Sequence, residues 1–165
     1  MHATQPINTA HVPHRRTLRF SGIDELRAHV DRIIAAESQG NARRLGNWSV
    51  GQNFGHLASW IGYSFDGVPM KVPFIVKLLM RPMKKRFIYK AMPAGRHIPR
   101  VPGGTLGHEP LSTEQGLAKL LPALGRLQAG APNLPHLLFG PLTHDQWINT
   151  HLRHAELHLS FIAIA

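Results

Sequence analysis

Four segments of the chain place apolar residues at the three- and four-residue spacing of an amphipathic helix. In IDELRAHVDRIIAA, the first of them, the apolar side chains recur in this way from Ile23 to Ile34. Side chains at these offsets lie on one face of a helix, where they can pack against a core. The pattern predicts helices near residues 22–38, 50–66, 112–130 and 144–162.

Each predicted helix follows a serine or threonine that can cap its first turn. In a capping box, a Ser or Thr side chain binds the backbone N–H three residues on, and a Gln or Glu at that position binds back. Ser21 precedes the first helix without such a partner. The other three helices carry the complete pattern, at Ser49 and Gln52, Ser112 and Gln115, and Thr143 and Gln146.

Prolines interrupt the pattern at two places. Pro122 lies inside the third predicted helix, where a proline is expected to kink or split it. Residues 67–111 contain many prolines and glycines and predict a long irregular crossover, in which FIVKLLM and KKRFIYK form short helices interrupted at Pro82. No segment alternates with period two for long enough to predict a sheet. We therefore expect an all-α fold, a four-helix bundle with a long Pro/Gly-rich basic crossover between the second and third helices.

Length and composition limit the class of protein. A chain of 165 residues fits one domain, and we expect an N-terminal arm over residues 1–20 and a helical domain over residues 21–165. Hydrophobic residues at 43% and charged residues at 17% are typical of a globular chain. There is no apolar run long enough for a transmembrane helix and no signal-peptide core, which favours the cytoplasm. The absence of cysteine excludes disulfides, thiolate metal ligands and a thiol nucleophile within the chain.

The net charge of +10 belongs to one segment. Between Gly67 and His108 there are nine basic residues and no acidic one, whereas ten basic and nine acidic residues nearly cancel elsewhere. No nucleic-acid-binding module accompanies this charge, so we expect no nucleic-acid partner. Residues 71–90 have three interpretations: a membrane-surface segment, a site for an anionic substrate group, or a solvated cover of the bundle. We favour the cover, expect no stable membrane insertion, and leave a homodimer open.

Histidines suggest the chemistry. His151, His154 and His158 fall at spacings of three and four in THLRHAELHLSF, although 12 histidines in 165 residues would produce about one H-x-x-x-H by chance. His151 and His158 are two turns apart, about 10.5 Å, which is too far to bind one ion. The candidate pair is therefore either His151 with His154 or His154 with His158. The second pair has the i,i+4 spacing, which aligns the two side chains better on one face of the helix.

His56 in the second predicted helix can complete such a site. It lies about 9 Å from the start of its helix, while His158 and His154 lie about 6 and 12 Å from the end of theirs. Antiparallel packing of the two helices would bring the three imidazoles to one level, whereas parallel packing would not. The alternative is a group of partly buried histidines that hydrogen-bond to each other or to water.

Three stretches of the sequence resemble the motifs of a known superfamily and occur in the same order. They are LGNWSVGQNFGHLASW, the dipeptide Asp66–Gly67 and LFGPLTHDQWINTHLRHAELHLSFI. Together, over roughly residues 17–163, they resemble the DinB/YfiT-like superfamily of metalloenzymes, and within it a bacterial branch of uncharacterised function. The resemblance implies a four-helix bundle that binds a divalent metal, zinc or nickel, through His56, His154 and His158. It also implies a low-molecular-weight thiol such as bacillithiol or mycothiol as a cosubstrate in some members.

Other side chains near the predicted site have two interpretations each. Asn53 either orients a ligand or contacts substrate, and Trp60 and Tyr63 either belong to the core or extend the site, with Trp60 binding substrate and Tyr63 donating its hydroxyl. Asp66 either holds an imidazole or simply ends its helix. His151 is a neighbour of the ligands or an exposed residue. The catalytic candidates are therefore His151, Tyr63 and Asp66.

The predicted function is metal-dependent chemistry on a small-molecule substrate. A three-histidine ion with an open position suits either a thiol-dependent transferase or a metal-assisted hydrolase. Glu156 is expected to pair with Arg153 and to face away from the ligands, so it is a poor general base. The rival hypothesis is a non-enzymatic helical bundle, either a ligand-binding protein or a basic membrane-surface module.

Overall fold

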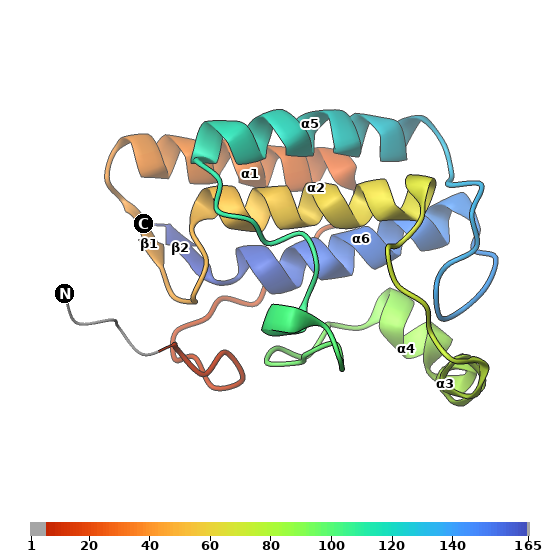
Figure 1. Ribbon diagram of the computed structural model, residues 1–165. Coiled ribbons are helices and arrows are strands. Elements are labelled where there is room, and N and C mark those ends of the chain that lie inside the picture. The colour runs from red at the N-terminus through yellow and green to blue at the C-terminus, as the bar shows by residue number, and fades with distance from the viewer. Residues whose placement is uncertain (1–5, 165) are drawn as a thin grey trace.

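Long helices form most of the computed structural model, which describes residues 6–164 (Figure 1). Within that range the long helices run side by side: α1 (Ile23–Ser38), α2 (Val50–Asp66), α5 (Thr113–Ala129) and α6 (His144–Leu159). The crossover contains the short helices α3 (Phe74–Met80) and α4 (Lys84–Tyr89), joined by the 3-10 turn η1 (Arg81–Met83), and a second 3-10 turn, η2 (Pro102–Gly104). The four predicted long helices and the two short ones around Pro82 are thus present.

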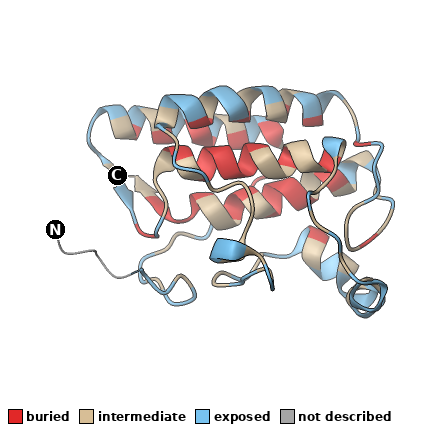
Figure 2. Ribbon diagram, viewed as in Figure 1, coloured by how far each residue is buried: buried red, intermediate tan, exposed pale blue. Residues whose placement is uncertain are grey.

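The long helices share one hydrophobic core. Each presents its apolar stripe inward, so the buried residues face the middle of the molecule (Figure 2). The most deeply buried aliphatic and aromatic side chains of these four helices are Val30 and Ile33 from α1, Phe54 from α2, Leu120 and Leu124 from α5, and Leu159 from α6. The spacing of apolar residues along the sequence therefore located the core correctly.

The helix starts follow the predicted capping chemistry with one exception. All three Ser/Thr–Gln capping boxes are present, at the starts of α2, α5 and α6. The prediction for Ser21 is wrong, because the cap position of α1 is Gly22 and no side chain caps it. Ser21 instead donates its backbone N–H and its hydroxyl to Glu25, at 2.8 and 2.7 Å.

Pro122 does not split its helix. α5 continues through it as one element from Thr113 to Ala129. A proline inside a helix costs about 3 kcal/mol. Leu120 and Leu124 on either side are fully buried, and burying each contributes about 1.5–3 kcal/mol. Their packing in the core offsets the cost of the proline.

A small antiparallel sheet corrects the all-α prediction. Within the part of the chain described, β1 (Ala42–Arg44) pairs with β2 (Ile162–Ile164), with Ala42 opposite Ile164 and Arg44 opposite Ile162. The fourth helix therefore ends at Leu159 and not near Ile162. Strands of three residues are too short to show an alternating pattern, and their partners are far apart in the sequence. The fold is mostly helical with one two-stranded sheet.

α2 and α5 run parallel and touch through their backbones. At their starts, a Cβ on Gly51 would collide with the carbonyl oxygen of Ser112, and at their ends Asp66 bonds Arg126. Two parallel neighbours need a link that returns the chain along the whole helix, about 25 Å for the 17 residues of α2. This return explains the length of the crossover, which passes over α2 and α6 (Figure 1).

The N-terminal segment is tied to the body at several points. Ile7 and Asn47 exchange two hydrogen bonds of 2.7 and 2.9 Å. The guanidinium of Arg15 lies over the ring of Phe161, 4.8 Å from its centre. Residues 1–5 of the predicted arm and residue 165 of the predicted domain lie outside the described residues.

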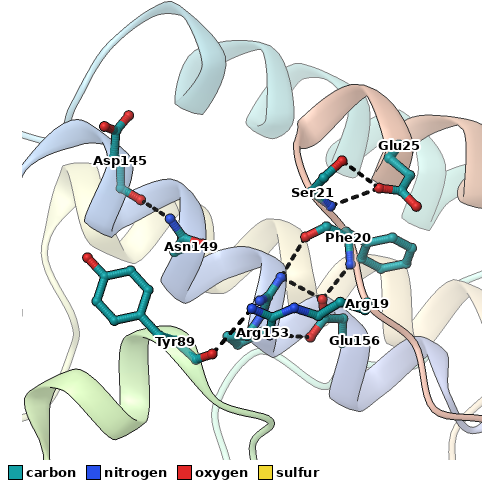
Figure 3. A network of polar contacts seen from close by, with 9 residues as sticks. All are labelled: Arg19, Phe20, Ser21, Glu25, Tyr89, Asp145, Asn149, Arg153 and Glu156. Atoms are coloured by element: carbon teal, nitrogen blue, oxygen red, sulfur yellow. Dashed lines mark hydrogen bonds and ion pairs between the residues drawn. The ribbon is translucent and has the colours of Figure 1, made fainter.

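A buried ion pair attaches the start of α1 to α6 (Figure 3). Arg153 and Glu156 pair at 2.6 Å, as predicted, and both side chains are almost fully buried. Arg153 donates to the carbonyl oxygen of Phe20 at 2.7 Å, while Glu156 accepts the Phe20 N–H at 2.6 Å. The two side chains thus satisfy both backbone groups of Phe20, which fixes where the chain enters α1.

Among the described helices, none combines the length and the apolar character needed to traverse a bilayer.

Candidate metal centre

Two contacts fix the relative direction of α2 and α6. His56 on α2 meets His154 on α6, with the two Nε2 atoms 3.2 Å apart, and Ser64 on α2 meets His151 on α6, with its hydroxyl 3.0 Å from Nε2. Moving forward along α2 therefore means moving backward along α6. The predicted antiparallel packing is confirmed, and it brings the three histidines to one level.

His56, His154 and His158 form a compact group of nitrogen donors. One ring nitrogen from each lies within 4.8 Å of the other two. On a tetrahedral zinc ion with bonds of about 2.0–2.1 Å, two nitrogens lie about 3.4 Å apart. The separation of 3.2 Å between His56 and His154 is close to that value. The three residues predicted as ligands therefore lie together in an arrangement that suits one ion.

The crossover orients the first of these rings. Nδ1 of His56 lies 2.9 Å from the carbonyl oxygen of Leu106. A carbonyl only accepts, so Nδ1 carries the proton and the lone pair of Nε2 faces the other two histidines. Such a bond to the far nitrogen is the usual support of a metal-binding imidazole. Sequence reasoning missed Leu106, because its backbone oxygen leaves no signal in the residue type.

Burial keeps the three imidazoles neutral. It lowers the pKa of His56 from 6.5 to about 4. The pKa values of His154 and His158 also lie well below 6.5, because of burial first and then of the neighbouring histidines. Neutral imidazole is the form that binds a metal. The group contains no carboxylate, so an ion there would keep its double positive charge and favour an anionic fourth ligand.

Two tryptophans border the histidines. Trp48 stacks on His158, with planes 4° and centroids 5.2 Å apart, and also on His108, at 10° and 6.0 Å. Trp60 presents its edge to His56 and His154, at 6.1 and 5.9 Å. Trp48 was missed in the sequence because it precedes the cap of α2 and belongs to no periodic pattern.

Two buried polar atoms near the group have no partner among the described residues. They are Nε1 of Trp60 and Nδ1 of His108. A buried indole N–H without an acceptor is costly, because it has lost its bond to water. Trp60 therefore has a free hydrogen-bond donor on a ring that packs against His56 and His154.

Asp66 does not hold an imidazole, so that interpretation is wrong. Its carboxylate binds both terminal nitrogens of Arg126 at 2.9 Å, and its side chain is 63% exposed. The hydrogen bonds from Arg126 hold the pKa of Asp66 below its usual value. Its partner comes from α5, and the distance along the helix that separates Asp66 from His56 keeps it away from the ligands.

The remaining candidates have structural partners. His151 is buried and bonds Ser64, so the interpretation as an exposed residue is wrong. Asn53 is buried and donates to the carbonyl oxygen of Ser49 at 2.8 Å, within the first turn of α2. Tyr63 packs edge-on against Trp60, with centroids 5.8 Å apart. Of the predicted catalytic and substrate-binding residues, Trp60 packs directly against two of the three imidazoles, those of His56 and His154.

Comparison with known proteins yields one family. The model of a family described as "Protein of unknown function (DUF1569)" matches residues 12–164, which include the whole histidine group. No curated protein and no solved structure matches the chain. The resemblance to the DinB/YfiT-like superfamily is untested by these findings and stays a prediction.

Proposed function

This chain belongs to the DUF1569 family, and from that premise we propose that it binds a divalent metal ion through His56, His154 and His158. One observation carries the proposal: three imidazole nitrogens from two antiparallel helices lie within 4.8 Å of one another. The bond from His56 to Leu106 supports it, because it leaves the Nε2 lone pair free. Zinc suits three nitrogen donors with an open position, and nickel is the second choice.

The proposal extends to the fold. We assign the chain to the four-helix bundles of the DinB/YfiT-like type, with α1, α2, α5 and α6 as the bundle. The shared core of these helices supports this assignment, as does a donor group built from the second and fourth of them. A cytoplasmic location belongs to the same proposal.

We further propose a thiol-dependent transfer to a small-molecule substrate, ahead of metal-assisted hydrolysis. When bound, the ion would supply a Lewis acid that lowers the pKa of a water or thiol in its open position. The chain has no cysteine, so the thiol must come from a cosubstrate. Hydrolysis also requires a general base. The two candidates for this role already have partners, since Asp66 pairs with Arg126 and His151 bonds Ser64. A thiol needs less assistance, because the charge of the ion is sufficient to deprotonate it.

Trp60 and Trp48 would bind and orient the substrate in this scheme. The unpartnered N–H of Trp60 can donate to a carbonyl or hydroxyl group brought next to the histidines. The rings of both tryptophans supply flat apolar surface and limit the access of water.

Metal analysis of tag-free protein tests the proposal. Protein loaded with zinc and then dialysed should retain about one ion per chain, and His154→Ala or His158→Ala should lose most of it. His151→Ala is the matched control, because it removes a buried histidine of the same helix that lies outside the group. Equal loss of metal in the control would contradict the chosen ligands.

The second candidate is a helical bundle without metal or enzymatic activity. One observation favours it: His56 and His154 already lie within hydrogen-bonding distance, and Nε2 of His154, if protonated, would donate to Nε2 of His56. The same analysis separates the two candidates, since wild-type protein without any bound metal under zinc-replete conditions would select the hydrogen-bonded group.

A further inference from the structure

The segment from Phe74 to Lys90 exposes many apolar side chains. No residue of α3 is buried, and most of its residues are exposed (Figure 2). Phe74 is 71% exposed, Leu79 69% and Ile75 57%. Val76, Leu78, Met83 and Tyr89 extend this exposed set. Scattered exposed apolar residues are ordinary, but a contiguous group on one short segment marks an interaction surface.

The same segment is strongly basic. Its cations are Lys77, Arg81, Lys84, Lys85, Arg86 and Lys90, Lys71 lies just before it, and no acidic residue occurs between Gly67 and His108. None of these cations forms an ion pair within the described part of the chain. The exposed apolar side chains are thus surrounded by uncompensated positive charge.

α4 anchors the segment, whereas α3 has no buried residue. Ile88 of α4 is fully buried, and Phe87 packs edge-on against Phe139 with centroids 5.2 Å apart. Lys84 donates to the carbonyl oxygen of Pro141 at 3.3 Å. α3 projects beyond α4, away from the long helices (Figure 1). The predicted role as a cover of the bundle therefore suits α4 but not α3.

We propose that α3 and η1 bind the surface of an anionic lipid bilayer. Apolar side chains such as Phe74 and Leu79 would enter the boundary between headgroups and acyl chains, while the neighbouring cations contact anionic headgroups. A helix of seven residues is about 10 Å long, so it lies on the surface and does not cross the bilayer.

Charge argues against a second copy of the chain as the occupant. A two-fold dimer through this face would bring the same patch of each subunit together. The cations of α3, η1 and α4 would then face an identical set, with no acidic residue of the segment between them. Anionic lipid headgroups are complementary to this charge, and acyl chains are complementary to the apolar side chains.

Vesicle sedimentation of the full chain tests the proposal. Vesicles of phosphatidylcholine with one third phosphatidylglycerol should bind the protein, and those of phosphatidylcholine alone should bind it at least tenfold more weakly. Binding should persist in part at physiological salt, because insertion of apolar side chains is not screened. Absence of binding to the anionic vesicles would overturn the proposal.

Two double variants assign the contributions of the two kinds of side chain. Phe74→Ser with Leu79→Ser should weaken binding at least tenfold, because two exposed apolar side chains can no longer enter the bilayer. Lys85→Glu with Arg86→Glu should abolish the preference for anionic vesicles. Both changes affect exposed side chains, and unchanged circular dichroism and metal content would show that the fold is intact.

A matched charge control is available on β1. Arg43→Glu with Arg44→Glu changes the net charge by the same amount at another exposed basic pair, and it should bind nearly as wild type. An equal loss of vesicle binding in this control would show that binding depends only on net charge. That result would overturn the assignment of the binding surface. A second outcome would also overturn the proposal. If the wild type binds no vesicles but self-associates, and Phe74→Ser with Leu79→Ser abolishes that self-association, the occupant is a second copy of the chain.

Discussion

Nε2 of His56 and Nε2 of His154 lie 3.2 Å apart, although 98 positions separate the two residues in the chain. An ion between them would therefore link α2 to α6 and stabilise the folded state. We expect zinc at 100 times its dissociation constant to raise the free energy of unfolding by about 2.7 kcal/mol. Chemical denaturation in the presence of zinc or of a chelator measures this increase. Zinc should stabilise His158→Ala little, and it should stabilise His151→Ala as much as the wild type.

Calorimetric titration of the zinc-loaded protein with bacillithiol and glutathione tests the proposed chemistry. We expect thiol binding that disappears in His154→Ala. Trp60→Phe should keep its metal but bind a hydrogen-bonding substrate about 2- to 10-fold more weakly, since one hydrogen bond contributes about 0.5–1.5 kcal/mol. Absence of thiol binding together with turnover of an ester or amide would instead favour hydrolysis.

Asp66→Asn should leave both metal content and thiol binding unchanged. Its carboxylate is exposed and bound to Arg126, and exposed ion pairs contribute little to stability. We expect only a small change in the midpoint of thermal unfolding. A large loss of metal or of thiol affinity would show that Asp66 acts on the site after all. Arg126→Gln serves as the control, because it removes the same ion pair from the other side.

The sequence predicted the features that depend on local chemistry. The capping boxes fixed the starts of α2, α5 and α6. The rise of 1.5 Å per residue, together with antiparallel packing, brought His56 to His154 and His158, although α6 ends at Leu159 and not near Ile162 as predicted. Features that depend on tertiary contacts were not predictable in this way. The β1–β2 pairing involves three-residue strands, and the bond from His56 to Leu106 involves a backbone oxygen.

Partners of charged residues were predicted only where they are close in the sequence. Arg153 and Glu156 lie one turn apart, so their pairing followed from helix geometry. Asp66 and Arg126 are 60 positions apart, and no sequence pattern connects them. The exposure of Phe74 was also unexpected, because an apolar run looks the same in the sequence whether its helix is buried or exposed.

Glu156→Gln should destabilise the protein by about 3–5 kcal/mol, because it leaves the buried Arg153 without a counter-charge. The variant keeps an acceptor for the N–H of Phe20, so the effect reports the lost charge. Urea denaturation measures the loss. Arg19→Ala should have a smaller effect, since Arg19 is exposed and lies 3.9 Å from Glu156.

Stability should decline on mild acidification. Burial, followed by the charge of Arg32, lowers the pKa of His29 from 6.5 to about 4, and burial lowers that of His136 to about 4. Such a group binds more protons in the unfolded state, so its contribution is complete above about pH 6.5 and is lost as the pH falls towards 4. Each contributes up to about 3 kcal/mol.

His29→Leu tests this pH dependence. The variant should show a flatter decline in unfolding free energy between about pH 6.5 and 4 than wild type, since it cannot take up that proton. Denaturation in the presence of a chelator keeps metal release out of the measurement. An unchanged slope would mean that His29 is not the proton acceptor.

The pairing of β1 with β2 has a consequence for protein synthesis. Ala42–Arg44 emerge from the ribosome long before Ile162–Ile164, and His56 emerges long before His154 and His158. The nascent chain must therefore hold its early strand edge and its first imidazole without partners while the crossover and α5 are translated. Domains commonly begin to fold from the N-terminal side during translation. In this protein the sheet and the histidine group can close only after α6 and β2 have been synthesised, when α6 docks against helices that are already present.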